Sequence, residues 1–511
     1  MVNRPVPRRI GLTAVCLAAL AYLSGCAVGN EYKRPNTPAG QAWSSTVWPA
    51  STASAPVPGG AAQRFVEGQP VPSEWWKLFG SPQLDALVVR AFKANPNVDS
   101  AQAALRQAQQ NVAAQRGFFW PTVQAQYTAT RTKIPLNDSG NSPGPQGDGS
   151  VITGPTIYNY HTAQLSVSYT PDVFGLNRRQ VESMQATAQY QRWQLEATYQ
   201  TLAANVVAAA VQEAMLREQI GITKSMIEGA QQSLDIVGRQ YKAGYAAKLD
   251  YALQESSLAQ ARQQLPPLQK QLDQTRDLLR VLVGTTPDDE LAEQFDLASL
   301  TLPIDLPVSL PSQVIEQRPD VRAAEEQLKS ASALVGVAKA NRLPQFPITA
   351  VAGGEASHFS QMFWSSGFFF NLAGSVMQPI FDGGTLRHRE KAAEEGYNQA
   401  AAQYKATVLN AYQNVADALH AVVSDSDALT IAMDVTRSTN ESLTLIRRQS
   451  VQGYVDRLAL ITAEQTARQA QLTQTQAQAT RFGNTAALFQ ALGGGLPPDL
   501  MPASETVSSA R

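Results

Sequence analysis

Residues 199–241 read YQTLAANVVAAAVQEAMLREQIGITKSMIEGAQQSLDIVGRQY, and the spacing of their apolar side chains is the strongest indication of the fold. Steps of alternately three and four residues from Tyr199 to Tyr241 meet apolar side chains everywhere except at Glu213 and Thr223. That spacing is the pattern of a coiled-coil seam, in which one stripe of a helix packs lengthwise against another helix. The sequence therefore predicts a long helix with a long partner.

The predicted helix is much longer than a globular core. If residues 177–241 form one helix, its length is roughly 95 Å at a rise of about 1.5 Å per residue. The same spacing returns later in the chain, at Val408, Tyr412, Val415, Leu419, Val422, Ser426, Leu429 and Met433. Rods of this length must pack along each other or along copies of the same chain.

The chain contains an internal repeat. Asn95-Pro96-Asn97-Val98 returns as Arg318-Pro319-Asp320-Val321, and each of these motifs opens a helical pattern. A second set of residues, Gln240, Gly244, Tyr245, Leu249 and Glu255, recurs at one constant offset as Gln449, Gly453, Tyr454, Leu458 and Glu464. Each copy is predicted to contain a helix, a pair of strands, a very long helix, a tight turn and a returning helix.

Apolar side chains alternate with Gln, Ser and Thr in two stretches of the first repeat, at Ala125, Tyr127, Ala129, Ala163, Leu165, Val167 and Tyr169. The second repeat has a less regular pair near residues 346–356 and 366–378, where Phe368, Phe370 and Leu372 share one side. Segments of about ten residues with one lipid-facing side are typical of transmembrane β-strands, and aromatic residues there suit a membrane-interface girdle. A sheet packed on a soluble core is the alternative.

Four strands are too few to close a barrel. An open sheet edge inside lipid would leave unpaired amides that cost several kcal/mol each, so a membrane sheet of this size needs strands from further chains. A proline marks each expected junction of helix and strand, at Pro121, Pro171, Pro344 and Pro379. Because proline has no N–H, it can end one hydrogen-bond ladder and let the next begin.

The first residues predict an exported lipoprotein. Three arginines precede an apolar core at residues 10–20, which is too short to span a bilayer as a helix. Leu23-Ser24-Gly25-Cys26 resembles a bacterial lipobox, in which a peptidase cuts before a lipidated cysteine. We expect Cys26 to be the sole lipid attachment site. Cleavage would remove Cys16, the other cysteine of the sequence, so no disulfide is expected.

The segment that follows the lipobox is rich in Pro, Ser, Gly and Ala and shows no sustained period, which predicts an extended tether lying on the folded body. Together these patterns divide the chain into five parts. They are a signal peptide at 1–25, a lipidated tether at 26–80, a first repeat at 81–300 with strands at about 122–173 and long helices at about 176–283, a second repeat at 301–495 with strands at about 346–378 and long helices at about 385–492, and a tail at 496–511.

Composition and spacing argue against an enzyme or a nucleic-acid-binding protein. The net charge of −1 and the pI of about 6.5 provide no basic field that would attract nucleic acid. The histidines are scattered and no Cys/His ligand spacing occurs, so neither a metal site nor a cofactor is predicted. No nucleophile can be combined with a base and an orienting group, so no catalytic residue is predicted.

Several motifs together resemble the outer-membrane efflux proteins, in particular the NodT-type lipoprotein branch that serves resistance-nodulation-division pumps. The motifs are Cys26-Ala-Val-Gly-Asn-Glu-Tyr-Lys-Arg-Pro35, Trp75-Trp76-Lys-Leu-Phe79, Asp172-Val-Phe-Gly175, Pro379-Ile-Phe-Asp-Gly-Gly384 and Ala491-Leu-Gly-Gly-Gly495. The resemblance implies a mainly α-helical homotrimer with transmembrane β-structure. Its twelve strands would form one TolC-like outer-membrane barrel, continued through the periplasm by a coiled-coil helical barrel.

The resemblance also implies location and partners. The chain would be lipid-anchored in the outer membrane, extend into the periplasm, and contact outer-membrane lipid. Its lower end would meet a periplasmic membrane-fusion adaptor and an inner-membrane resistance-nodulation-division transporter. The expected function is export of drugs or other small toxic compounds, and hence antibiotic resistance. Type I protein secretion, a periplasmic coiled-coil scaffold lipoprotein and a lipid-anchored hydrolase are the alternatives.

The two helix-to-helix turns, Ala243–Lys248 and Gln452–Arg457, are expected at the periplasmic tip. Glycine permits each reversal, while the following tyrosine can pack on a neighbouring helix. The residues assigned to the tip and gate are Tyr245, Lys248, Asp250, Tyr454, Asp456 and Arg457. The resemblance implies that Asp456 and Arg457 lie near a three-fold axis and hold the aperture shut through polar links. An exposed ion pair at the outside of the turn is the competing interpretation.

Overall fold

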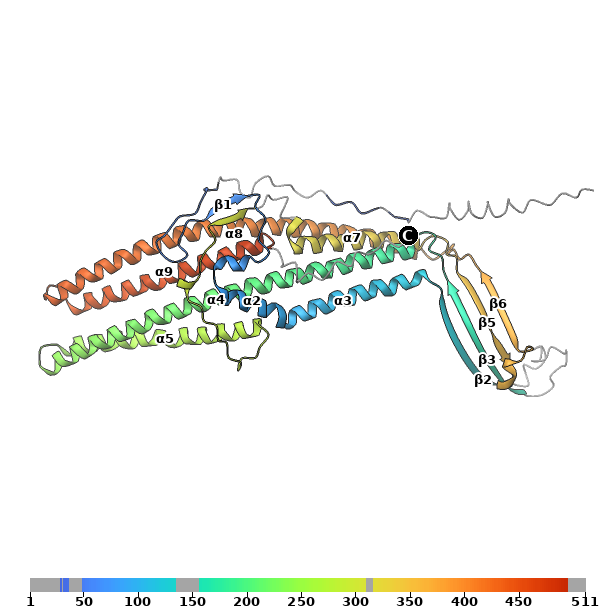
Figure 1. Ribbon diagram of the computed structural model, residues 1–511, viewed down its shortest axis with the longest axis horizontal. Coiled ribbons are helices and arrows are strands. Elements are labelled where there is room, and N and C mark those ends of the chain that lie inside the picture. Colours follow the sequence, from blue (N-terminus) through green and yellow to red (C-terminus); the bar gives the residue numbers. More distant parts are fainter. Residues whose placement is uncertain (1–27, 30, 36–47, 135–155, 309–315, 495–511) are drawn as a thin grey trace, which may run out of the picture. The chain divides into compact units, whose positions relative to one another are not determined.

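Two compact units make up the part of the chain that the computed structural model describes, namely residues 28–29, 31–35, 48–134, 156–308 and 316–494 (Figure 1). The first unit comes from Met1–Arg34, Gln107–Ala188 and Gln327–Ala401, and the second from Pro35–Arg106, Gln189–Glu326 and Ala402–Arg511. The chain passes from one unit to the other within four helices, which are α3 (Pro96–Arg116), α4 (Leu176–Lys242), α7 (Pro319–Ala340) and α8 (Thr385–Val451). Both repeats therefore contribute to both units.

A four-stranded antiparallel sheet dominates the first unit. Its order is β2 (Thr122–Ile134), β3 (Thr156–Tyr169), β5 (Ile348–Ala356) and β6 (Phe368–Gly374), so each repeat supplies one hairpin. Figure 1 shows the four strands side by side, with β2 and β6 at the edges. The prediction of a mainly helical chain with two strand pairs is confirmed.

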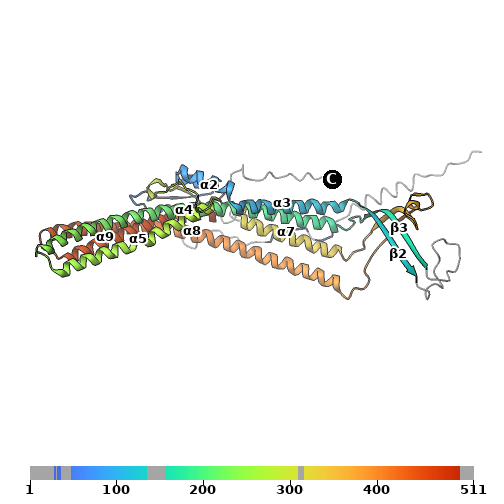
Figure 2. The same ribbon diagram turned by 90° about the horizontal axis from the view of Figure 1, so that it is seen from below.

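Two helix pairs form the body of the second unit. The first pair is α4 with α5 (Lys248–Leu282), and the second is α8 with α9 (Arg457–Ala491). Figures 1 and 2 both show the two connecting turns at the same end of this helical bundle. The helices are long because their apolar spacing lets each one bury a continuous stripe against its neighbours.

The predicted seams are buried in their central parts, whereas Tyr241 at the end of the first seam is 42% exposed. In α4, Val206 and Leu216 are fully buried, and in α8 the same holds for Val415 and Val422. The polar exception Glu213 is also fully buried, where its carboxylate accepts hydrogen bonds from Arg217 and Arg276, both at 2.8 Å. A buried carboxylate without such partners would be strongly destabilising, so the two arginines explain how the seam tolerates this residue.

The N-terminal segment contains more structure than a tether. Strand β1 (Arg64–Glu67) pairs in parallel with β4 (Asp305–Val308) from the start of the second repeat. A short 3-10 helix, η1 (Trp75–Phe79), precedes α2 (Pro82–Ala94), and the Trp75 ring stacks on Phe489 at 5.6 Å between centroids. The remaining 3-10 turns are η2 (Gly117–Phe119), η4 (Leu297–Ser299) and η5 (Phe359–Phe363). Part of the expected tether is therefore core of the second unit.

A buried arginine fastens the same segment to α9. The Arg481 guanidinium is fully buried and donates to the Thr52 hydroxyl at 3.1 Å and to the Ala61 carbonyl at 2.7 Å. Burial lowers the pKa of Arg481, and the nearby Asp425 carboxylate opposes that shift. The N-terminal segment thus packs on α9 through a specific polar anchor.

Candidate functional site

One face of the four-stranded sheet is apolar across all strands. The register places Ala125 opposite Leu165, Leu165 opposite Ala352, and Ala352 opposite Phe370. Adjacent rows on this face contain Val123, Val167, Ala350 and Leu372, and also Tyr127, Ala163, Gly354 and Phe368. Leu165 is 55% exposed and Phe370 is 76% exposed. These large side chains are therefore not buried by the described part of the chain.

The opposite face of the sheet is mainly polar. Gln126 lies opposite Gln164, whose amide donates to the Gln126 side-chain oxygen at 3.4 Å. Ser166 and Asn371 belong to the next row on this face. The predicted alternation is correct, and the exposure of the apolar face disfavours a sheet packed on a soluble core of the same chain.

Aromatic side chains gather at both ends of this sheet. At the end near η5, the Tyr127 hydroxyl contacts the His161 Nδ1 at 2.9 Å, and the Phe359 ring meets the edge of both rings. At the end where the helices begin, Trp120 is 75% exposed and Phe381 is 91% exposed. Aromatic girdles at both membrane interfaces are typical of transmembrane β-structure. From the sequence, only Phe368 and Phe370 of β6 were predicted to belong to such a girdle.

The four prolines lie between helices and strands. Pro121 directly precedes β2, and Pro171 follows the end of β3. Pro344 lies between α7 and β5, and Pro379 lies between β6 and α8. Each proline therefore occupies a connection in which a strand ladder gives way to a helix or the reverse.

Two aspartates at these connections start the long helices, and sequence reasoning missed their role. The Asp172 carboxylate accepts hydrogen bonds from the backbone N–H groups of Asn177 and Arg178, at 2.9 and 2.8 Å. Asp382 accepts from Gly384 and Leu386 at 2.8 and 2.7 Å, and these bonds lower its pKa. Carboxylates at helix N-termini satisfy otherwise unpaired N–H groups. The signal was present in the two Asp-containing motifs.

The two helix-to-helix turns share one backbone geometry. Gly244 and Gly453 have φ angles of 80° and 78°, a region that glycine adopts without strain. The following N–H groups, of Tyr245 and Tyr454, donate to the Gln240 and Gln449 carbonyls at 2.8 and 3.0 Å. This is a Schellman-type helix end in both repeats. The repeated Gln-x-x-x-Gly-Tyr pattern therefore encodes a repeated turn.

The tyrosines of these turns do not pack as expected within one chain. Tyr245 is 87% exposed and Tyr454 is 78% exposed, so neither ring is buried against a helix of the same chain. Packing of each aromatic side chain on a helix of a neighbouring copy stays a prediction.

The charged residues of the two turns have different partners. The Asp456 carboxylate caps α9 by accepting from the Ala459 N–H at 2.8 Å, while the Arg457 Nη2 donates to the Ser233 carbonyl of α4 at 3.4 Å. In the first turn, Asp250 accepts from the Ala247 N–H at 3.1 Å, and Lys248 is exposed. Within the described residues, Asp456 and Arg457 form no ion pair with each other. Arg457 instead connects the second helix pair to the first.

The sequence profile described as Outer membrane efflux protein matches residues 87–285 and 310–494. The chain belongs to the outer membrane efflux protein family. Members of this family form efflux channels and are not enzymes, and this efflux protein is an outer-membrane channel of that kind. The two matched stretches correspond to the two repeats found in the sequence.

Individual relatives match the efflux protein over nearly its whole length. Pyoverdine export outer membrane protein OpmQ of Pseudomonas putida is 29% identical over 456 residues, covering 89% of this chain and 95% of that protein. The probable efflux pump outer membrane protein TtgC of Pseudomonas putida is 25% identical over 481 residues, covering 94% and 95%. The solved outer-membrane channel OprN superimposes with a TM-score of 0.79 at 25% identity, covering 93% of this chain and 100% of that one.

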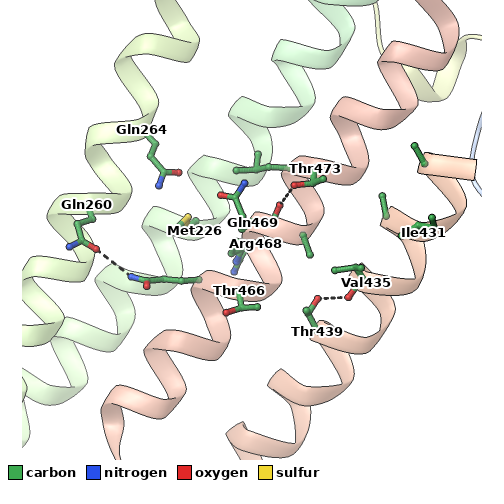
Figure 3. Close-up of a pocket in the computed structure, with 15 residues that line it drawn as sticks. Met226, Gln260, Gln264, Ile431, Val435, Thr439, Thr466, Arg468, Gln469 and Thr473 are labelled. Carbon is green, nitrogen blue, oxygen red and sulfur yellow. Dashed lines mark hydrogen bonds between the residues drawn. The ribbon is translucent and has the colours of Figure 1, made fainter. Parts of the chain in front are cut away.

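A groove of about 850 Å³ lies between α5, α8 and α9 of the efflux protein (Figure 3). Its walls combine apolar side chains of α8, such as Ile431 and Val435, with amides and hydroxyls of α5 and α9. The Gln465 amide donates to the Gln260 side-chain oxygen at 3.4 Å and so links α9 to α5 along one wall. The groove therefore offers both apolar surface and hydrogen-bonding groups.

Helix α8 carries a second apolar stripe that contributes to this groove. Ile431, Val435 and Leu445 are 63%, 47% and 52% exposed. At about 100° per residue they lie within an arc of about 80°, nearly opposite the buried seam of the same helix. Helix α8 therefore has apolar residues on two opposite sides, and the described part of the single chain buries only the side that carries the seam.

Two further findings concern membranes and metals. In the described ranges, no helix combines the length and the hydropathy that crossing a bilayer requires. In that same part of the chain, no group of acidic, histidine or cysteine side chains is arranged to hold a metal ion. The predicted lipidation site, Cys26, lies outside the described residues.

Proposed function

We propose that this efflux protein works as a homotrimer whose twelve strands form one outer-membrane barrel. The observation that carries the proposal is the sheet of the first unit, which has an uncovered apolar face and two edge strands, β2 and β6. In lipid, the unpaired amides of these edges need partners, and neighbouring copies can supply them.

The strand order suits closure by identical copies. Each strand is antiparallel to the next from β2 to β6, so β6 of one copy can continue the antiparallel pattern with β2 of the following copy. This is a head-to-tail interface that closes into a ring. Two copies would give eight strands, a size at which side chains largely fill the interior, whereas three copies leave room for a conduit.

The helices support the same arrangement. The stripe of Ile431, Val435 and Leu445 faces away from the seam of α8, and a helix from a second copy would bury it. A closed ring of long helices needs each helix to contact neighbours on two sides, which is what two apolar stripes provide. The trimer would thus continue below the barrel as a helical conduit.

The proposed anchor is a diacylglyceryl thioether on Cys26 with an amide-linked acyl chain. Two or more acyl signals are what stable membrane anchoring requires. Mass spectrometry of the mature protein should find this modification on residue 26. An unmodified N-terminus at a different position would overturn the lipid anchor without affecting the channel.

The tip residues are proposed to bind the periplasmic adaptor and, with the inner-membrane transporter, complete the pump. Tyr245 and Tyr454 are exposed at the two turns, where they can contact a partner. The names of the relatives mention pyoverdine export and efflux pumps, which favours small molecules over proteins as cargo. Deleting the gene and testing sensitivity to a panel of toxic compounds identifies the substrates.

Two adjacent substitutions on β6 test the barrel. Phe370 lies on the apolar face and Asn371 on the polar face. A lysine facing lipid costs about 2–4 kcal/mol at the bilayer centre, while lumen-facing positions tolerate charge and tune selectivity. Phe370→Lys should therefore abolish trimers that resist SDS. Asn371→Lys should keep them and shift the conductance in planar bilayers toward anions.

The same two variants also show which results would contradict the proposed barrel. Equal loss of assembly in Phe370→Lys and Asn371→Lys would show that the two faces do not have different surroundings, against a membrane barrel. Cross-linking of the unaltered protein that stops at dimers would rule out the trimer.

A further inference from the structure

The described N-terminal residues lie against the connection between β3 and α4. The Val28 N–H donates to the Phe174 carbonyl at 3.1 Å. Phe174 belongs to the motif that begins with the helix-capping residue Asp172. The backbone of residue 28 is therefore tied to the site where the strand ends and the long helix starts.

A buried arginine holds the next backbone groups. Arg179 of α4 is 8% exposed; its Nε donates to the Val28 carbonyl and its Nη2 to the Gly29 carbonyl, both at 3.3 Å. The third nitrogen, Nη1, donates to the Glu182 carboxylate at 2.6 Å. A planar guanidinium has a fixed fork of donors, so the bond to Glu182 orients the other two toward the N-terminal segment.

Two glycines make the close approach possible. Gly29 has a φ of 116°, and a Cβ added to it would lie 2.9 Å from the Gly336 Cα of α7. A Cβ on Gly336 would lie 3.0 Å from the Arg179 Cγ and Cδ. A side chain at either position would therefore push the N-terminal segment or Arg179 out of place. The contact is built from three elements that come from distant parts of the sequence.

The contact continues beyond residue 29. The Lys329 ammonium of α7 lies 5.6 Å from the centre of the Tyr32 ring, within the range of a cation–π interaction. Tyr32 is thereby placed on the same helix as Gly336. The N-terminal segment follows α7 instead of meeting the unit at one point.

We propose that Arg179, Gly29 and Gly336 form an N-terminal clamp that determines where the acylated end of the chain enters the membrane. Cys26 precedes Val28 by two residues, and an extended chain of that length covers about 7 Å at most. The clamp fixes residue 28 at the connection between β3 and α4, so it limits how far from that connection the acyl chains can enter the membrane. The clamp contacts stand independently, whereas their effect on the acyl chains rests on the proposed lipid anchor.

The test is the mobility of a nitroxide label on Glu31→Cys in the full-length protein, purified and placed in phospholipid vesicles. Glu31 is exposed, and acylation of Cys26 leaves the introduced cysteine as the free thiol. The label should be motionally restricted in the unaltered background. Gly336→Ala and Arg179→Ala should each shorten its rotational correlation time by about threefold or more, toward that of a free chain end.

Matched controls separate the clamp from general damage. Gly396 is a helical glycine of the same unit whose added Cβ would meet open space, so Gly396→Ala should leave the label at position 31 restricted. Arg342 is an arginine of the same unit that pairs with Glu390, and Arg342→Ala should also have no effect there. A second label on Lys391→Cys, exposed on α8, should report unchanged mobility in every variant.

The outcomes decide the clamp and the anchor separately. Unchanged mobility at position 31 in Gly336→Ala and Arg179→Ala would overturn the clamp, as would an equal increase in Gly396→Ala. Labelling of cells with a palmitate analogue tests acylation in parallel. If Cys26 does not incorporate the palmitate analogue, the proposed lipid anchor is wrong. The mobility of the nitroxide still shows whether the clamp exists.

Discussion

The two helix-to-helix turns have the same backbone but different charged side chains. Both end their first helix through a glycine with positive φ and the same hydrogen bond to a glutamine carbonyl. The repeat aligns Lys248 with Arg457, yet only Arg457 donates to a helix of the other pair, at the Ser233 carbonyl. Both repeats thus have the same turn geometry, while Arg457 in place of a lysine lets the second turn contact the α4–α5 pair.

Because of this difference, we propose that the second turn, and not the first, forms a gate at the tip. A polar link between helix pairs can be broken without unfolding either pair, as an opening movement requires. The link uses one hydrogen bond of 3.4 Å from a half-buried side chain, so its contribution is small. The first turn has no equivalent connection through Lys248 in the described residues.

The largest expected effect is on conductance. Arg457→Ala removes the link to α4 and should raise the resting conductance of the purified trimer roughly twofold or more, whereas Lys248→Ala should leave it unchanged. Asp456→Ala should also raise conductance and should lower cation selectivity, because three copies would place a ring of carboxylates near the axis. Single-channel recordings measure both quantities. Equal behaviour of Arg457→Ala and Lys248→Ala would place the gate elsewhere on the tip.

A second comparison concerns the long helices. Burial raises the pKa of Glu196 to about 6, and Arg192 opposes the shift. The corresponding residue of α8 is the exposed Lys405. Because the folded-state pKa lies above the ordinary value of 4.5, the stabilising contribution of protonated Glu196 is complete below that value and is lost as pH rises through about 6.

Glu196→Gln should therefore raise stability by up to about 2 kcal/mol at neutral pH and weaken the pH dependence between the two pKa values. Thermal unfolding followed by far-UV circular dichroism at several pH values provides the measurement. Lys405→Gln should change stability by no more than about 0.5 kcal/mol at any pH. A Glu196→Gln variant that is less stable than the unaltered protein at neutral pH would show that pairing with Arg192 outweighs burial.

The turn glycines should behave alike. Gly244→Ala and Gly453→Ala each force an L-residue into positive φ, which costs roughly 1–2 kcal/mol. No atom lies within 4 Å of either added Cβ, so the cost is backbone strain in both cases. Chemical denaturation of the purified protein should give equal losses. A clear inequality would reveal that one glycine has a packing role that the shared geometry does not explain.

The smallest expected difference lies in the helix caps of the two turns. Asp456→Ala removes a direct N-cap and should destabilise α9 by about 1 kcal/mol. Asp250→Ala removes a carboxylate that accepts from the Ala247 N–H and should cost less, about 0.5 kcal/mol. Hydrogen exchange in the first turn of each returning helix detects such local changes. A larger increase in exchange rate in α5 of Asp250→Ala than in α9 of Asp456→Ala would contradict the predicted order.

The periodic parts of the fold could be predicted from the sequence because one physical cause dominates them. Burial of one stripe produces the seam from Tyr199 onward, and the alternation around Leu165 follows from the two faces of a strand. The repeat was visible in residues such as Gly244 and Gly453, whose conformations few other residues can adopt. These features depend on neighbours in the sequence or on a simple period.

The remaining features depend on distant partners. Arg179 carries no local sign that it binds the Val28 and Gly29 carbonyls, and nothing near Arg481 indicates a contact with Thr52. Arg457 could be assigned to the tip, but not to Ser233, because that contact joins the two repeats. Long-range polar contacts have no period, so they become visible only when the packing of the helices is known.

The open edges of the sheet also have a kinetic consequence. A newly exported chain presents one unpaired edge on each of the strands β2 and β6 together with an apolar face, so this sheet is incomplete in a single copy. If three copies close the sheet, the last step of folding needs several chains to meet. Its rate then falls more steeply than the concentration of newly exported chains. Scarce chains would then spend longer exposed to aggregation and proteolysis. The level of synthesis would therefore determine what fraction of the chains assembles into channels before it is lost.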